Sequence, residues 1–127
     1  MSLLNLLLDA DPKSLTEYPT EKIKLKRLSK VCGSDFIVEI RALTQREIDE
    51  LPQDAHREHV ILKGVTNIEF GDTGLRERLK PESRKTPLTP VEVIQRLFLP
   101  GEIARLSSSI LDLSGFGDGM LEKIEKN

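Results

Sequence analysis

The segment that most constrains the fold lies near the C-terminus and reads LFLPGEIARLSSSILDLSGFG, residues 97–117. Pro100 favours the first turn of a helix, because the amide hydrogen of that position has no partner within the helix. Four apolar residues then follow the spacing of one helical face: Ile103, Leu106, Ile110 and Leu113. Gly115 predicts the end of this helix. The segment contains no His, Cys or Lys, so we expect it to pack rather than to catalyse.

A second helix is predicted directly before this one. Thr89 and Glu92 have the spacing of a capping box, with Pro90 at the first helical position. Leu99-Pro100 interrupts the helix. Its apolar face is expected to consist of Val91, Ile94 and Phe98, with Val93 and Leu97 beside them. The two C-terminal helices therefore offer adjoining apolar faces.

Thr44 and Glu47 form another capping box and predict a short helix that Pro52 interrupts. A longer helix is expected over residues 53–63, and Gly64 predicts its end. Three apolar residues of this helix are expected to be buried: Val60, Ile61 and Leu62. The region that follows is expected to contain a loop over 65–74, a helical turn over 75–80 and a linker over 81–90.

Two segments with alternating apolar and polar residues predict a β-hairpin. Residues 21–30 place Ile23 and Leu25 on one side and lysines on the other. In the second segment four residues face one way: Phe36, Val38, Ile40 and Ala42. SKVCGS joins the two segments, and Gly33 can adopt the positive φ that a tight turn needs. The basic row of the first strand would lie opposite Glu39, which favours the pairing.

The first residues of the chain predict a leucine-rich helical arm. Ser2 can cap a short helix that contains five leucines: Leu3, Leu4, Leu6, Leu7 and Leu8. Asp11-Pro12 predicts its end, and residues 12–20 are expected to be a linker. So much apolar surface on a short helix either folds back onto the body or binds a partner.

Composition and the spacing of apolar residues along the sequence together predict an α+β fold. The chain has 127 residues, of which 38% are hydrophobic, with no Trp, one Tyr and four Phe, so a modest aliphatic core is expected. We expect a single domain over 1–127 in which the hairpin packs with a mainly α-helical part. Its predicted parts are the arm and linker over 1–19, the hairpin over 20–43, the helical part over 44–115 and a polar, mobile tail over 116–127.

Charge and cysteine content limit the partners. A net charge of −2 argues against nucleic acid as the main partner. Basic residues gather in 20–30 and 76–85, and acidic residues in 39–58; solvated faces explain this, and a docking surface for an acidic partner is the alternative. A single Cys32 predicts a reducing compartment. The apolar N-terminus is too short to span a membrane and lacks a basic leader, so a cytosolic protein is expected.

No residue pattern points to catalysis. His56 and His59 have a spacing that two metal ligands use, but no third or fourth ligand accompanies them. GFGDG follows a helix, whereas phosphate loops precede one. Phe116 lies between two glycines beyond the helix end, where it either plugs the edge of the domain or anchors a partner. No catalytic, cofactor-binding or metal-binding residue is predicted, so an interaction protein is favoured over an enzyme.

Three segments together resemble the XkdN-like phage tail assembly chaperones of Gram-positive phages and PBSX-type prophages. They are the Leu-rich start, RALTQREIDEL at 41–51 and LFLPGEIARLSSSILDLSGFG at 97–117. The resemblance covers nearly the whole chain and is weakest over residues 52–88. Gln45 stands where the family motif has glycine after Leu-Thr, a difference that helix capping tolerates.

The resemblance implies a small non-enzymatic protein that coats the tape-measure protein, keeps it soluble and helps to recruit tail-tube subunits in the cytoplasm of the bacterial host. A structural accessory subunit of a tail or baseplate is the alternative. The candidate partner-binding residues are Leu4, Leu7, Leu97, Phe98 and Phe116. No cofactor, metal, nucleic acid or membrane is expected, and the sequence permits self-association.

Overall fold

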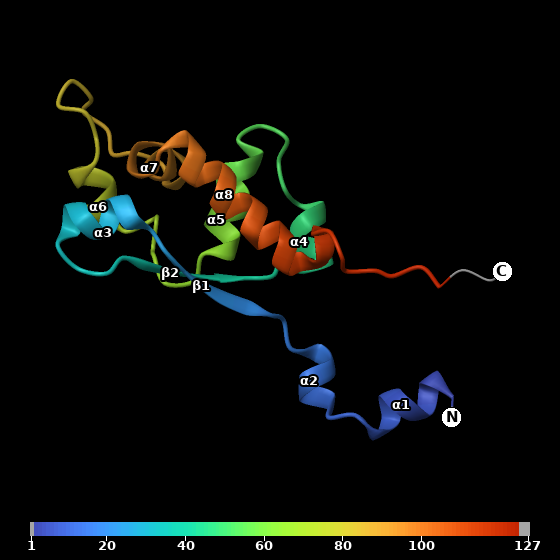
Figure 1. Ribbon diagram of the computed structural model, residues 1–127. Helices are drawn as coiled ribbons and strands as arrows, with labels where there is room; N and C mark the ends of the chain where they lie inside the picture. Colours follow the sequence, from blue (N-terminus) through green and yellow to red (C-terminus); the bar gives the residue numbers. More distant parts are fainter. Residues whose placement is uncertain (1, 125–127) are drawn as a thin grey trace.

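Helices cover one face of a two-stranded antiparallel sheet, and an N-terminal arm extends away from this body (Figure 1). The computed structural model describes residues 2–124. The α+β class predicted from the sequence is confirmed. In chain order the elements are α1 (Leu3–Asp9), α2 (Pro12–Thr16), β1 (Thr20–Lys24), α3 (Lys26–Cys32), β2 (Ile37–Arg41), α4 (Gln45–Asp49), α5 (His56–Gly64), α6 (Thr73–Arg78), α7 (Pro90–Leu97), α8 (Pro100–Leu111) and the π-helical turn η1 (Asp112–Phe116).

The strand pair has the predicted orientation and faces. Ile23 of β1 lies opposite Val38 of β2, and Lys22 lies opposite Glu39, with 3.6 Å between the ammonium nitrogen and the nearer carboxylate oxygen. Val38 and Ile40 are fully buried, whereas Ile37, on the other face, is 43% exposed. The alternation of β2 therefore identified the buried face of the sheet.

The predicted tight turn between the strands is wrong, because helix α3 connects them. Leu25 and Leu28 are both buried, and their three-residue spacing fits one helical face and not an alternating strand. The Ser29 hydroxyl accepts the amide hydrogen of Phe36 at 2.8 Å and ties the end of α3 to the chain that enters β2. Gly33 has the expected positive φ of 72°, but it ends a helix there instead of forming a hairpin turn.

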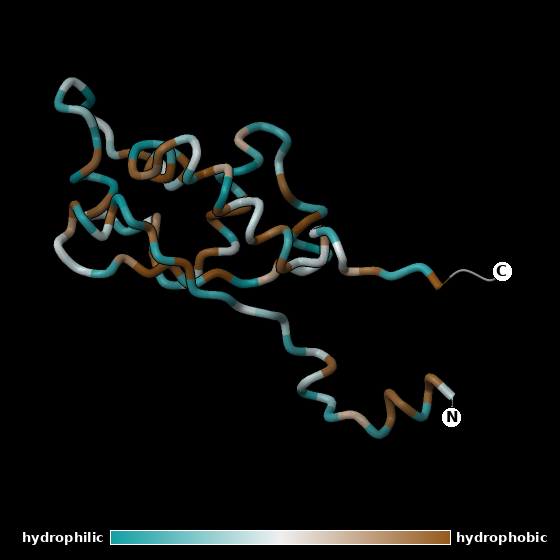
Figure 2. Tube along the Cα trace, in the orientation of Figure 1, coloured by the Kyte–Doolittle hydropathy of each residue, from teal (hydrophilic) through white to brown (hydrophobic). Residues whose placement is uncertain are grey.

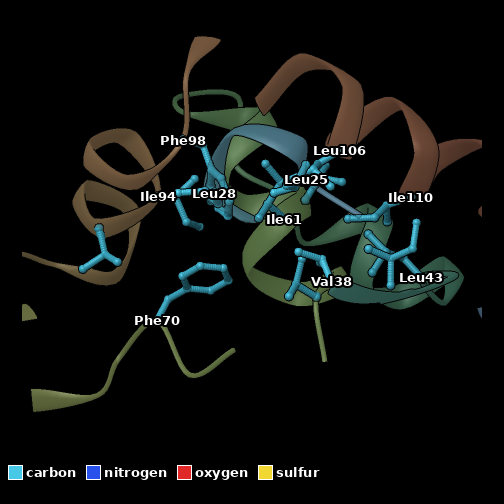
Figure 3. Close-up of a cluster of buried hydrophobic side chains, with 14 of the residues drawn as sticks. Leu25, Leu28, Val38, Leu43, Ile61, Phe70, Ile94, Phe98, Leu106 and Ile110 are labelled. Atoms are coloured by element: carbon cyan, nitrogen blue, oxygen red, sulfur yellow. The ribbon is translucent and has the colours of Figure 1, made fainter. Parts of the chain in front are cut away.

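Helices α5, α7 and α8 supply most of the core opposite the sheet, and α5 packs against both of the others. Figure 3 shows Val38, Ile61, Leu106 and Ile110 gathered in this core. The largest fully buried side chains are Ile40, Ile61, Ile94, Leu106, Ile110, Val38, Val60 and Val93. The core is aliphatic, as the composition predicts.

Gly64 ends α5 at the predicted residue but serves another purpose. It does not have a positive φ. A Cβ at Gly64 would lie only 2.6 Å from Cδ1 of Ile110, so the missing side chain lets α5 approach α8 closely. The glycine is a packing residue between two helices.

Both predicted capping boxes are confirmed, at Thr44 for α4 and at Thr89 for α7. At α4 the Arg41 guanidinium also donates to Glu47, with 2.6 Å between Nη2 and Oε2. The hydrogen bond from Arg41 and those from Thr44 outweigh burial and lower the pKa of Glu47 to about 2. The end of β2 is thus joined to the start of α4 by an ion pair.

The segment between α5 and α7 packs against the body, although apart from the helical turn predicted over 75–80, which is α6, its sequence predicts loop and linker. Val65 forms a single antiparallel bridge with Ile40. Phe70 is buried edge-on against Phe98, with 6.1 Å between the ring centroids. Leu88, in the predicted linker, is only 2% exposed. Distant apolar residues hold this irregular segment in place.

The arm consists of two short helices where one helix and a linker are predicted. Ser2 caps α1 by accepting the amide hydrogen of Asn5 at 3.1 Å, as expected. Asp11 caps α2 by accepting the amide hydrogen of Lys13 at 3.1 Å, so residues 12–16 are helical and not linker. Among residues 2–124 no helix is long and apolar enough to cross a membrane. Residues 1 and 125–127, at the outer ends of the predicted arm and tail, lie outside the described residues.

Candidate partner-binding surfaces

The first candidate surface is the leucine arm, which we define as the five leucines of α1 (Leu3, Leu4, Leu6, Leu7 and Leu8). Their side chains are between 52% and 79% exposed, and none of the residues of α1 is buried. In Figure 2 the trace of α1, largely brown for hydrophobic residues, lies apart from the body. At about 100° per residue, the leucines cover about 200° of the helix, and Asn5 and Asp9 share the narrow polar side.

Five exposed leucines on one short helix favour burial against another apolar surface. Covering one leucine side chain contributes about 1.5–3 kcal/mol, and soluble monomers rarely expose contiguous apolar patches of this kind. A seven-residue helix is also marginal by itself in water. A partner that covers the leucine arm would therefore both bury apolar area and stabilise the helix.

The second candidate surface is a groove between β1 and α8, which we call the β1–α8 groove. Its volume is about 400 Å³, and it is lined by Ile23, Lys24, Leu25, Leu99, Gly101, Glu102, Arg105, Leu106 and Ser109. Gly101 leaves room on the α8 side, because a Cβ added there would meet no atom within 4 Å. β1 is an edge strand, so its outer side is not covered by a third strand.

One wall of this groove is fixed by an ion pair between Arg27 of α3 and Glu102 of α8. Nη2 of Arg27 lies 2.8 Å from Oε1 of Glu102 and donates a second hydrogen bond to the carbonyl of Leu97 at 2.7 Å. Burial by itself would raise the pKa of Glu102, but hydrogen bonds from Arg27 and from the Leu99 amide lower it. The carboxylate therefore stays ionised and holds the start of α8 against α3.

The rim of the groove carries Lys24, Glu102 and Arg105, two cations and one carboxylate. Lys24 lies 2.9 Å from Asp35, and both side chains are more than half exposed. Arg105 is exposed on α8 and takes part in none of the ion pairs found among the described residues. The groove thus combines an apolar floor with Arg105, a cation outside these ion pairs, a combination suited to an apolar helix that carries an acidic end.

The five residues predicted to contact a partner differ in how exposed they are in the structure. Leu4 and Leu7 are exposed on the arm, at 63% and 54%. Leu97 is partly buried, and its carbonyl is used by Arg27. Phe98 is 3% exposed and belongs to the core beside Phe70, so its ring is covered by the protein itself. Phe116 is 62% exposed, so the plug that was the other interpretation of this residue is wrong.

The sequence interpretation missed part of the apolar surface. Beyond η1 the predicted polar tail carries three exposed apolar residues: Met120, Leu121 and Ile124. The β1–α8 groove was also missed, because its two walls are far apart along the chain and no local pattern joins them. Gly101 directly after Pro100 was the available signal, since glycine at a helix start leaves a gap in the surface.

The two histidines do not assemble a metal site with other ligands. Within residues 2–124, no group of three or more His, Cys, Asp and Glu side chains could hold a metal ion. Cys32 is exposed at the end of α3.

A small α+β body with an exposed apolar arm and an apolar groove defines a protein-interaction module. The chain belongs to the phage XkdN-like tail assembly chaperone protein (TAC) family, whose model matches residues 53–127. The match contains the 97–117 segment and all but the first residue of the 52–88 region, where the resemblance is weakest. It leaves out the leucine arm, both strands and the 41–51 motif. No curated protein and no solved structure gives a significant match. Membership of this family assigns the chain to phage tail assembly.

Proposed function

We propose that this protein is a non-catalytic chaperone that binds the tape-measure protein in the cytoplasm of the host, keeps it soluble and assists the assembly of tail-tube subunits around it. The family supports a role in tail assembly. The observation that carries the choice of partner is the leucine arm, whose five side chains are all at least half exposed. Tape-measure proteins are long and helical with apolar stripes, and such a client needs its stripes covered before assembly.

The geometry of the arm suits this client. A short helix with an apolar arc packs against another helix through side chains spaced three and four residues apart. Leu4 and Leu7 have this spacing near the centre of the arc. Because each contact is short, many copies binding along one client would be needed to cover it, and each copy would add a modest affinity. Leu97 and Phe116 are proposed as additional contacts.

The experiment is co-expression of the chain with the tape-measure protein of the same phage. We expect the double variant Leu4→Ser/Leu7→Ser to keep the melting temperature within about a degree, because both leucines are more than half exposed and neither belongs to the core cluster. It should leave the tape-measure protein largely insoluble and weaken its co-purification. Val31→Ser is the matched control, since Val31 is 72% exposed on α3, away from the arm. A double variant that solubilises the client as well as the parent protein would refute the proposal for the arm.

Mass spectrometry of purified phage particles addresses the alternative, a structural accessory subunit of the tail or baseplate. A chaperone is released before the particle is complete and is expected to be absent. Detection of the chain in the particle at a fixed ratio to the tail-tube protein would favour the structural subunit instead.

A further inference from the structure

We infer that the β1–α8 groove of one copy binds the leucine arm of a second copy, so that the protein self-associates head to tail. This inference goes beyond the proposed function and does not depend on it. Within residues 2–124 the leucines of α1 are exposed, and the β1–α8 groove has a floor that includes Leu25 and Leu106. Both surfaces are present once in every copy, so each arm has one matching groove.

Charge supports the match between arm and groove. The arm and its linker to α2 carry Asp9 and Asp11 and no basic residue up to Pro12. Asp9 lies at the C-terminal end of α1, directly after the last leucine. At the groove, Lys24 is paired with Asp35 and Glu102 with Arg27, whereas Arg105 takes part in none of the ion pairs found in residues 2–124. A leucine face lying on the apolar floor would bring the acidic end of the arm to Arg105, where opposite charges attract.

The direction of the arm favours a second copy over the same copy. The chain segment that carries α1 and α2 enters β1 at Thr20. The groove lies beside Ile23 to Leu25, at the other end of the strand. Figure 1 shows the arm leaving from the end of β1 that lies away from α3. Docking into its own groove would require the chain to turn back along β1, and the capped helix α2 directs it away instead.

The arm is wide enough to bind two surfaces at once. Its leucines cover about 200° of the helix, whereas a stripe of about 100° is enough to face one groove. One side can therefore lie in the groove of a neighbour while other leucines remain available to a client. The contact joins two different surfaces and need not close on itself, so repeated contacts would form an open row of copies. An open row suits a protein that covers a long client.

The test measures the oligomeric state of the purified chain without client, by sedimentation velocity over a range of concentrations. We expect the parent protein to form dimers and larger species as concentration rises. An arm variant, Leu4→Ser/Leu7→Ser, and a groove variant, Gly101→Phe, should each stay monomeric. We expect the phenylalanine to occupy the groove, because Gly101 lines it, a Cβ there meets no atom within 4 Å and the residue does not have a positive φ. If Gly101→Phe fails to fold, Leu99→Ser, at a groove position that is 52% exposed, replaces it.

The deciding measurement is an equimolar mixture of the two variants. The groove variant still has an intact arm, and the arm variant still has an intact groove. The mixture should therefore form a one-to-one dimer that does not grow further. If the leucine arms associated with one another, Gly101→Phe would still self-associate, which would overturn the inference. If each arm used its own groove, the parent protein would be monomeric and hydrogen exchange would show an arm protected only while the groove is intact.

Charge exchange provides an independent check. Asp9→Lys and Arg105→Glu should each weaken self-association, by about tenfold in the dissociation constant. The double variant, with the charges exchanged, should recover most of the affinity. If the double variant loses as much binding free energy as the two single variants together, the proposed orientation of the arm is contradicted. Because Gly101→Phe retains all five arm leucines, it should still bind the tape-measure protein, so failure of self-association and failure of client binding are distinguishable.

Discussion

The close approach of α5 and α8 at Gly64 makes a testable prediction about the core. An alanine Cβ at this position would lie 2.6, 2.7 and 2.9 Å from Cδ1, Cγ2 and Cγ1 of Ile110. Ile110 is fully buried, and a β-branched side chain in a helix has essentially one preferred χ1 rotamer. The isoleucine therefore cannot move aside without displacing the helix.

Two opposing effects determine how the substitution Gly64→Ala changes the free energy of unfolding. Overpacking of a tight core costs about 1–3 kcal/mol. Alanine is favoured over glycine within a helix by about 1 kcal/mol, and less at the last residue of α5. The net expectation is destabilisation of about 0–2 kcal/mol. Gly101→Ala is the matched control, because its Cβ would meet no neighbour within 4 Å, and we expect it to be neutral or slightly stabilising.

The sign of the effect should reverse when Ile110 is shortened. Ile110→Ala removes all three atoms that crowd position 64 and costs about 2–5 kcal/mol by itself. In this background Gly64→Ala meets no clash and should stabilise by up to about 1 kcal/mol. The double-mutant cycle thus has an expected coupling of about 1–3 kcal/mol. Urea denaturation followed by circular dichroism measures all four proteins. Equal effects of Gly64→Ala in the two backgrounds would refute close packing as the reason for the glycine.

Three further predictions concern the core, a cap and an ion pair. Leu106→Ala should lower the free energy of unfolding by about 2–5 kcal/mol, because the side chain is almost fully buried, and a smaller loss in urea denaturation would contradict its place in the core. Thr89→Ala should cost about 1 kcal/mol, since the hydroxyl accepts the Glu92 amide hydrogen at 3.2 Å; the variant Thr89→Ser should retain most of the stability. The pKa of Glu47, lowered from 4.5 to about 2 by Arg41, implies stability that is fully present above about pH 4.5 and is lost as the pH falls toward 2. Thermal unfolding of Glu47→Gln and of the parent protein over this range should show a difference that shrinks with decreasing pH, and a constant difference would show that the charge of Glu47 is not involved.

The sequence by itself determined the features that depend on neighbouring residues. Thr44 and Thr89 cap helices because the hydroxyl and the amide hydrogen that it binds are three residues apart. The stripe that contains Leu106 and Ile110 and the alternation of β2 each identify a buried face within one element. Gly115 has a φ of 98° within η1, as a glycine at a helix end predicts. Each of these features needs contacts within a few residues only, so a short window of sequence contains the whole cause.

Only the tertiary structure decided which apolar residues are exposed and where surfaces meet. Phe98 is buried because Phe70 covers it, and Gly64 matters because Ile110 lies against it. The β1–α8 groove brings β1 together with α8, and the ion pair of Arg27 and Glu102, 75 residues apart, joins α3 to the start of α8 beside it. The leucines of α1 are apolar like those of a core helix, yet among residues 2–124 they lie outside the core cluster and are at least half exposed. The spacing of apolar residues along the sequence predicts that a side chain favours burial. The surface that buries it belongs to a distant part of the chain or to another molecule.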